Sequence, residues 1–222
     1  MEPSIVSRDE FLQRYWDYYL ILEKDFLETE RYLTIDELNF NAFSNEYIKQ
    51  YQTICSEIDV IAKSFCKELD STFAGSKIDS YCKVILDNNT DFANGIVNVR
   101  NRNIKIIPWQ NWACSVTQRD DGTTKISAIN PDWWKKYNKI KHNRTTINSE
   151  TQLPYYKLAN QKNTLYALAA LFQLELYYYR TLHRLHFASE PDMPSQSKMF
   201  EMDNWGNKWV VTEGDLAFQV EG

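Results

Sequence analysis

A scarcity of structure-breaking residues constrains this chain more than any other feature. Its 222 residues include only six glycines and six prolines, whereas average usage predicts about 27 such residues. Neither type occurs between Pro3 and Gly75 or between Pro154 and Pro191. These gaps exclude collagen-like, linker-like and proline-rich chains, and they disfavour a β-sandwich, which needs a turn signal about every 8–12 residues. We therefore expect long helices.

Composition indicates one folded domain. Hydrophobic residues make up 43% of the chain and aromatic residues 14%, which is enough for one sizeable core over residues 1–222. The net charge of −5 gives the chain as a whole no attraction for nucleic acid or an anionic membrane, so any such binding needs a local patch. The first residues lack the pattern of a signal peptide, and the most apolar stretch, 165–179, is too short and too polar to span a bilayer. We expect a cytoplasmic protein without a membrane partner.

The spacing of cysteine and histidine does not indicate a disulfide scaffold or a metal site. The four cysteines form no C-x-x-C pair, and we interpret them as reduced core thiols. His183 and His186 have the i, i+3 spacing of metal ligands, but a third ligand is not evident, so we favour their interaction with the helix C-terminal dipole. Glycine-rich phosphate-binding motifs are missing from the sequence, and we predict neither a metal nor a cofactor. The cysteines are Cys55, Cys66, Cys82 and Cys114.

Capping patterns followed by apolar residues at a spacing of three to four locate the first helices. Most starts combine a Ser or Thr, whose side chain accepts a backbone hydrogen bond, with an acidic residue three positions later. The helices predicted behind them cover about 8–31, a short turn, a long segment that ends before Gly75, and a third helix beyond it. The predicted starts are Ser7 with Glu10, Thr34 with Glu37, Ser44, and Ser76 with Asp79.

The hydrophobic period changes after residue 95. Residues 96–107 alternate as in a hairpin, and residues 112–129 contain a second hairpin that turns at Asp121-Gly122. The tail over 205–221 has the pattern of a third hairpin, turning at Gly214, and one hypothesis joins it to the inserted strands in a single small sheet. Residues 188–198 are predicted to form a mobile loop.

Helical spacing resumes at Asn130-Pro131, an N-cap residue followed by proline at the first helical position. This helix runs to about residue 144, and the last long helix covers about 155–186. The predicted fold is therefore mainly α. It is an up-and-down bundle of four long helices over 8–92 and 130–186, with a small antiparallel β insertion over 95–129 and a C-terminal hairpin over 205–221.

The predicted helix that ends near Arg144 carries an excess of positive charge. Between Lys135 and Arg144 it has five basic residues and no acidic one. In an acidic protein such a helix is a candidate surface for an anion or a phosphate group. An equally weighted interpretation is a solvated basic face that pairs with neighbouring acids, or an internal ladder of ion pairs.

Helical spacing brings three chemically useful side chains of this segment together. Asn138, Lys141 and His142 share one face with Trp134, so an amide, an ammonium and an imidazole lie on consecutive turns. A neutral histidine can act as a general base, and a lysine can stabilise negative charge that develops on a phosphate. This set of groups suits metal-independent cleavage of RNA. A lone histidine on a helix is more often structural, so both interpretations stay open.

The run Y-N-K-I-K-H over residues 137–142 resembles the R-N-x-x-x-H signature of the HEPN superfamily, compact helical-bundle domains of bacterial defence, toxin–antitoxin and RNA-processing systems. Asn138 and His142 match the Asn and His of that motif, whereas Tyr137 stands where the motif has Arg. The resemblance covers about ten residues of the chain. It implies an HEPN-like bundle, RNA cleavage by the motif residues, and a homodimer in which the helices over 131–144 face each other.

In that family an acidic residue on an earlier helix often supports the motif. Asp59 is a candidate because it falls in the row Cys55, Asp59, Ala62, Cys66, which is otherwise apolar. Burying a carboxylate in such a row is costly unless a cation or a donor meets it. We predict that Asp59, or Glu57 on the rim of the same face, lies opposite the helix that carries His142. The alternative is an acid on the helix surface.

The predicted function is that of an HEPN-like protein of bacterial RNA metabolism or phage defence, of the toxin–antitoxin type, acting as a metal-independent endoribonuclease. His142 would take a proton from a ribose 2′-hydroxyl, and Lys141 or Arg144 would stabilise the phosphate. The alternative is a non-catalytic module whose basic helix binds a nucleotide, an antitoxin or regulatory protein, or a second copy. Tyr137 favours that alternative. The candidate catalytic residues are His142, Asn138, Lys141, Arg144 and Asp59.

A second basic patch occurs on the first predicted hairpin. It combines three cations with two tryptophans, a mixture that suits single-stranded nucleic acid. Packing of the tryptophan rings against the bundle is the interpretation we favour. The residues are Arg100, Arg102, Lys105, Trp109 and Trp112.

Overall fold

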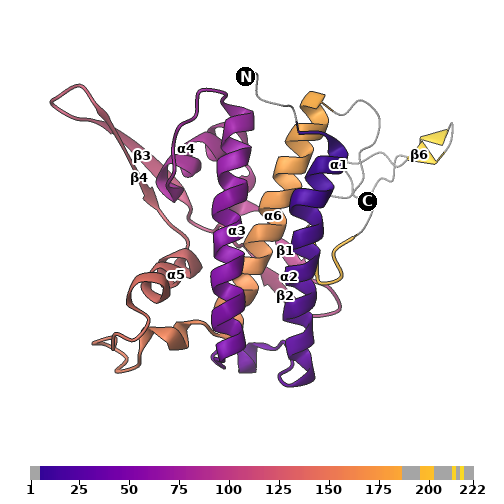
Figure 1. The fold of residues 1–222 in the computed structure, drawn as a ribbon, viewed down its shortest axis with the longest axis vertical. Coiled ribbons are helices and arrows are strands. Elements are labelled where there is room, and N and C mark those ends of the chain that lie inside the picture. The colour runs from indigo at the N-terminus through magenta and orange to yellow at the C-terminus, as the bar shows by residue number, and fades with distance from the viewer. Residues whose placement is uncertain (1–5, 187–195, 203–211, 214–215, 218–222) are drawn as a thin grey trace.

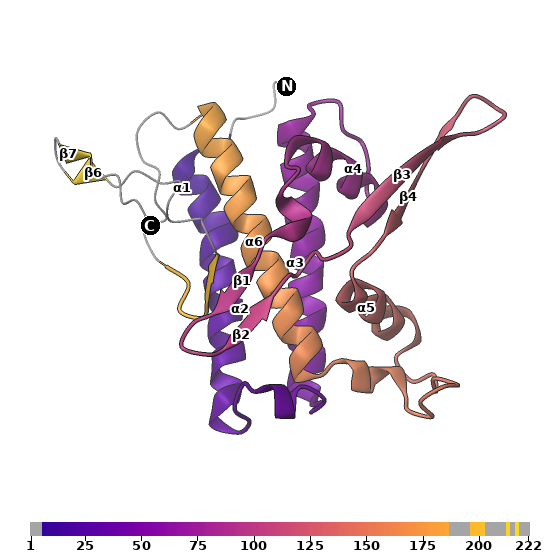
Figure 2. The same ribbon diagram turned by 180° about the vertical axis from the view of Figure 1, so that it is seen from behind.

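Three long helical segments lie side by side and form the body of the molecule (Figures 1 and 2). The structure is a computed structural model, and it describes residues 6–186, 196–202, 212–213 and 216–217. The first segment is continuous and is made of α1 (Arg8–Phe11), a π-helical stretch (Leu12–Trp16), α2 (Asp17–Glu28) and a 3-10 turn (Thr29–Arg31). The other two are α3 (Asn45–Leu69) and α6 (Gln161–His186).

Helix α6 is the centre of the core. It packs against α3, α2, α1 and α5 (Asp132–Asn143), and every residue from Ala167 to Tyr179 is buried. A helix that is buried on all sides must be apolar or have its polar groups satisfied internally. Two short helices complete the helical part: α4 (Ile78–Asn88) packs on α3, and α5 lies beyond α3 on the side away from α2 (Figure 1).

Two of the five predicted N-caps, Ser7 and Ser44, are confirmed at the level of their hydrogen bonds. Ser7 Oγ accepts from the Glu10 amide over 3.2 Å while Glu10 accepts from the Ser7 amide over 3.0 Å, and Ser44 Oγ accepts from the Tyr47 amide over 3.0 Å. The other three predicted caps are wrong by one or two residues. Asp36, not Thr34, caps the 3-10 turn at Glu37–Asn39.

Helix α4 also begins later than predicted. Its N-cap is Lys77, whose amide donates to Ser80 Oγ, rather than Ser76. The N-cap of α5 is Pro131, one residue later than predicted, because the Asn130 side chain donates to Asp79 instead of capping its own helix. The mainly α fold is thus confirmed, but the expected bundle of four long helices is wrong: three helical segments of the described residues are long, and α4 has only 11 residues. The last helix also begins later than the predicted residue 155, at Gln161, because Tyr155–Leu158 form a separate 3-10 helix.

Both inserted hairpins are confirmed, yet they belong to different sheets. Strands β1 (Val97–Val99) and β2 (Ile104–Ile106) pair antiparallel, and β3 (Ala113–Gln118) pairs with β4 (Thr124–Ile129) in a separate hairpin that projects from the body (Figure 2). Gly122 has a φ of +79° in the second turn, a conformation that side chains disfavour. The predicted single sheet is therefore wrong.

The third strand of the β1–β2 sheet lies C-terminal to α6 in the sequence. Strand β5 (Phe200–Met202) pairs with the free edge of β1, giving the order β2-β1-β5. The C-terminal hairpin appears as β6 (Thr212–Glu213) paired with β7 (Leu216–Ala217) in a sheet of its own. Gly214, the remainder of the predicted hairpin over 205–221, and residues 188–195 of the predicted loop lie outside the described residues.

A buried carboxylate holds the segment before β5 in place. Glu23 of α2 is 2% exposed. It accepts hydrogen bonds from the Tyr19 hydroxyl (2.8 Å), from the amides of Lys198 and Met199 (3.0 Å each), and from the Ser197 hydroxyl. Because four donors satisfy the carboxylate, its burial is tolerated. The same bonds hold the backbone of residues 198–199 next to the edge of β1, where β5 begins.

Tryptophan packing joins the first hairpin and α5 to the core. Trp109 and Trp112 are buried with ring centroids 4.5 Å apart, and Trp109 Nε1 donates to the Ala170 carbonyl over 3.2 Å. Nearby, Arg100 pairs with Glu201 and Arg102 with Glu30. The packing interpretation of the two tryptophans is confirmed.

Helix α6 also contains a buried carboxyl group that forms no hydrogen bond with the described residues. Glu175 is fully buried, and neither of its oxygens has a hydrogen-bond partner among the described residues. Burial first, and then the negative charge of Glu57, raise the pKa of Glu175 well above its ordinary value. The buried environment therefore favours the protonated, neutral form of the Glu175 side chain.

A Glu175→Gln variant should change the pH dependence of stability. Because the folded pKa is raised, the folded state binds more protons than the unfolded state once the pH exceeds the ordinary pKa of 4.5. The free energy of unfolding of the wild type therefore falls as pH rises, by at most about 1.4 kcal/mol per pH unit. In urea titrations from pH 4.5 to 8, the variant should become progressively more stable relative to wild type. The exposed Glu150→Gln is the matched control, and parallel curves for Glu175→Gln and wild type would contradict the prediction.

Among the helices of the described ranges, none has the length and apolar character needed to cross a membrane. The four cysteines are free thiols, of which Cys114 is half-buried and the other three are buried. This agrees with their interpretation as reduced thiols, three of them in the core.

Candidate functional site

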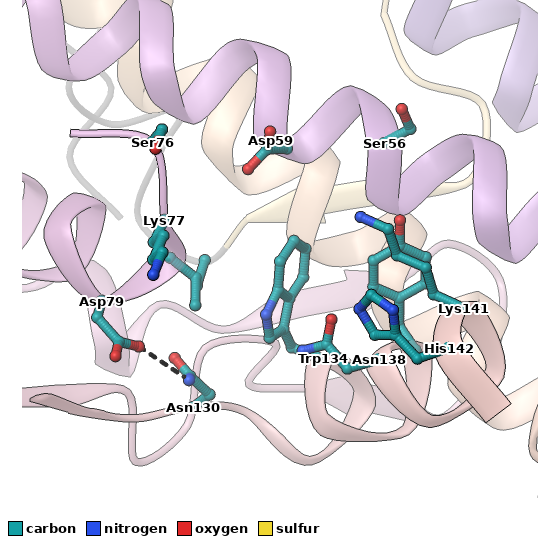
Figure 3. Close-up of a pocket in the computed structure, with 12 residues that line it drawn as sticks. Ser56, Asp59, Ser76, Lys77, Asp79, Asn130, Trp134, Asn138, Lys141 and His142 are labelled. Atoms are coloured by element: carbon teal, nitrogen blue, oxygen red, sulfur yellow. Dashed lines mark hydrogen bonds between the residues drawn. The ribbon is translucent and has the colours of Figure 1, made fainter. Parts of the chain in front are cut away.

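A cleft of about 540 Å³ lies between α3, the start of α4 and α5 (Figure 3). Its volume is in the range of small-ligand sites. Most of its lining side chains are polar or charged, which is unusual for a gap between packed helices. The lining residues are Ser56, Asp59, Ser76, Lys77, Ile78, Asp79, Asn130, Trp134, Tyr137, Asn138, Lys141 and His142.

Buried contacts fix α5 at one wall of this cleft. Trp133 Nε1 donates to the Pro108 carbonyl over 2.6 Å, and the Tyr51 hydroxyl of α3 donates to the Trp133 carbonyl. Tyr137 packs edge-on against Tyr51, with ring centroids 6.1 Å apart. These contacts orient the opposite face of α5, the face with Asn138 and His142, toward the open space (Figure 3).

Four of the five predicted site residues meet in this cleft. Asn138, Lys141 and His142 come from α5, and Asp59 comes from the facing side of α3. Asp59 is half-buried, and its negative charge helps to raise the pKa values of two phenols, Tyr81 and Tyr137, after burial itself. The predicted juxtaposition of Asp59 with the α5 face is therefore present.

The fifth predicted residue lies elsewhere. Arg144 is the exposed C-cap of α5 and does not line the cleft; its carbonyl accepts from the Tyr156 amide over 2.9 Å. Glu57, the alternative acid, is also outside the cleft, and its charge acts on Glu175 in the core, while burial raises the pKa of Glu57 itself. Of the two candidate acids, Asp59 is the one that lines the cleft.

The basic residues of α5 divide between two directions. Lys136 pairs with Asp132 over 2.6 Å, and Lys139 lies over the Tyr155 ring, 5.3 Å from its centroid. Lys141 faces the cleft, 5.7 Å from the centroid of the Tyr137 ring, a distance at which a cation and a π-system attract each other. The interpretation of α5 as a solvated, pairing face thus holds for part of the helix, whereas Lys141 belongs to the cleft.

Tyr137 is a structural side chain. It is 6% exposed and packs against Trp134, with ring centroids 5.2 Å apart. Burial, followed by the nearby Cys55 and Asp59, raises the pKa of Tyr137 to about 12. Its hydroxyl is therefore neutral at physiological pH, and it cannot supply the positive charge that an arginine would bring to this position.

The sequence did not indicate that Lys77 belongs to the site. It comes from the turn before α4 and adds a second cation to the cleft, across from Lys141 (Figure 3). Within the part of the chain that the structure describes, neither lysine side chain nor Asp59 forms an ion pair, so their charges are available to a ligand. No sequence signal marks Lys77, because its place depends on how α4 docks on α3.

Asp79, Asn130 and Ser56 also belong to the cleft but were not predicted as site residues, for two different reasons. Asp79 and Asn130 read as capping residues in the sequence, but their side chains bond to each other over 3.2 Å across 51 positions of chain. Ser56 lies three residues before Asp59 on α3, so helical periodicity alone places it on the same face.

The described residues contain no group of three or more His, Cys, Asp or Glu side chains placed to hold a metal ion. Outside the cleft, His186 Nε2 bonds to Glu68 Oε1. The polar groups that line the cleft are therefore an imidazole, two ammonium groups, two carboxylates, two amides and the hydroxyls of two serines and one tyrosine.

Comparison with known proteins adds no further assignment to the cleft. The motif similarity over residues 137–142 stays a resemblance, and the role of each side chain must be inferred from the cleft itself. No family model matches the chain, and neither a curated protein nor a solved structure matches it.

Proposed function

We propose that the cleft binds and cleaves RNA without a metal ion, as the site of an HEPN-like protein of bacterial RNA metabolism or phage defence. One observation carries the proposal: Asp59 of α3 lines the same cleft as Asn138, Lys141 and His142 of α5. The cleft holds two ammonium groups and two carboxylates, and Lys141 lies beside His142 at one end, where it can meet a phosphate group.

The groups suit an internal transesterification. His142 takes the proton of a ribose 2′-hydroxyl, and the resulting oxygen attacks the adjacent phosphorus. The bond from phosphorus to the 5′-oxygen breaks, that oxygen takes a proton from water, and a 2′,3′-cyclic phosphate remains. Lys141 stabilises the negative charge on the phosphoryl oxygens. Asn138 orients the phosphate, and Asp59 on the opposite wall accepts a hydrogen bond from the ribose.

The test is cleavage of total RNA in the presence of EDTA. A His142→Ala variant should lose cleavage by about 10²–10⁴-fold, the usual contribution of a general base. Lys141→Ala should also lose activity, whereas Lys139→Ala, on the same helix but over Tyr155, should cleave like wild type. Arg144→Ala should behave like Lys139→Ala, since Arg144 lies outside the cleft. Equal cleavage by wild type and His142→Ala, or none by wild type, would remove the proposal.

The buried Tyr137 favours a second candidate, a non-catalytic module that binds a nucleotide in the same cleft. It predicts wild-type binding of RNA or nucleotide, weakened by Lys141→Ala, without any product of cleavage. Pairing with an antitoxin or regulatory protein, or with a second copy through residues 131–144, remains a prediction. Sedimentation of the wild type beside a Lys135→Glu variant of the exposed α5 surface tests self-association.

A further inference from the structure

The two ends of the cleft carry different chemistry. Figure 3 shows Asn138, Lys141 and His142 at one end, and Asp79 with Asn130 at the other. The indole of Trp134 lies between them. A ligand that fills the cleft therefore meets Lys141 and His142 at one end, an aromatic ring in the middle, and the acceptors of Asp79 and Asn130 together with Lys77 at the other end.

The acceptor end is held by a specific contact. Asn130 Nδ2 donates to Asp79 Oδ1 over 3.2 Å, which orients the carboxylate. The side-chain oxygen of Asn130, Oδ1, is buried and takes no hydrogen bond from the described residues. A carboxylate has about four acceptor positions, so Asp79 keeps most of its capacity after bonding to Asn130.

Two carboxylate oxygens side by side are complementary to two parallel N–H donors. Among the four RNA bases, guanine presents such a pair on its Watson–Crick edge, at N1–H and the N2 amino group. Adenine and cytosine present one amino group on that edge, and uracil presents one imino group. Unstacked bases are commonly read on this edge while they contact aromatic side chains, and Trp134 offers one here.

We propose that the Asp79–Asn130 pair selects guanine as the base of the nucleotide whose 3′-phosphate lies at the Lys141–His142 end. The proposal rests on the proposed function for its choice of RNA, and it names the substrate class of that cleft. A nucleotide is an appropriate occupant because the cleft volume of about 540 Å³ is of small-ligand size. The enzyme would then cut on the 3′ side of guanosine.

The experiment measures the binding of the four nucleoside 3′-monophosphates by calorimetry. Wild type should bind 3′-GMP about tenfold or more tightly than the other three, in line with discrimination by one bidentate contact. Asp79→Asn should bind all four with similar, weak affinity, because an amide nitrogen would face the guanine donors. The control Asp87→Asn makes the same change on an exposed residue of α4 that pairs with Lys83, and it should keep the preference.

Two outcomes overturn the proposal: equal wild-type affinity for the four nucleotides, or a preference that survives in Asp79→Asn. Asn130→Ala provides an independent variant, which should also reduce the preference, and circular dichroism checks that each variant is folded. Failure of the two proposals is distinguishable. A 3′-GMP preference without RNA cleavage supports guanine selection and removes the nuclease, whereas cleavage after all four bases equally supports the nuclease and removes guanine selection.

Discussion

A Glu23→Ala variant should lose about 3–5 kcal/mol of the free energy of unfolding, because it strands several buried donors at once. The carboxylate accepts from the Tyr19 and Ser197 hydroxyls and from the amides of Lys198 and Met199. The Tyr19 and Ser197 hydroxyls lie 3.0 Å apart and can still bond to each other. The amides of Lys198 and Met199 lose their acceptor, and the segment that places β5 on the edge of β1 loses its attachment to α2.

Denaturant unfolding followed by circular dichroism measures this loss. Asp17→Ala, an exposed acid of the same helix, is the matched control and should change stability by no more than about 0.5 kcal/mol. Should Glu23→Ala fail to fold, Glu23→Gln keeps the shape but turns an amide nitrogen toward the donors. Hydrogen exchange at Lys198 and Met199 should then accelerate. Wild-type stability of Glu23→Ala together with unchanged exchange in Glu23→Gln would contradict the prediction.

Trp109→Ala should have an effect of similar size, about 3–5 kcal/mol, through loss of a fully buried ring. The ring contacts Phe92, Trp112 and Trp133, with centroids 5.3, 4.5 and 5.3 Å away. Trp133 in turn belongs to α5, so the cavity left behind should loosen the wall of the cleft as well as the core.

The check is the midpoint of guanidinium unfolding, compared with Tyr32→Ala, which removes a ring that is 90% exposed. Trp109→Phe is the milder variant, with an expected loss of about 1–2 kcal/mol, because it keeps an aromatic ring but removes the donor to the Ala170 carbonyl. A Trp109→Ala protein as stable as Tyr32→Ala would show that this ring is not central to the core.

The periodicity of apolar residues was sufficient to locate most elements. Local spacing predicted the helices that begin after Ser7 and Ser44, and the Asp121-Gly122 turn predicted the β3–β4 hairpin. These features depend on contacts within a few residues, such as a side chain that caps its own helix. Predictions that required distant partners were less accurate, as the single sheet shows: the free edge of β1 is taken by β5.

The candidate site also combines residues that local spacing predicts with residues that only helix packing brings in. Asn138, Lys141 and His142 are predictable because residues three and four apart share a helix face, and Asp59 is predictable as a carboxylate in an otherwise apolar row. Arg144 follows the same helix but lies beyond its last turn, where its side chain is exposed. Lys77 and Asp79 reach the cleft only because α4 packs against α3.

The sequence by itself determined the mainly α character, the extent of the first two long helical segments and the face of α5 that carries its polar groups, because capping and helical periodicity act over short stretches of chain. Only the tertiary structure decided which side chains meet. The bond between Asn130 and Asp79, the burial of Tyr137 and the attachment of residues 197–199 to Glu23 each join parts of the chain that are far apart. Such contacts depend on how the helices pack, and no spacing within one helix specifies that packing.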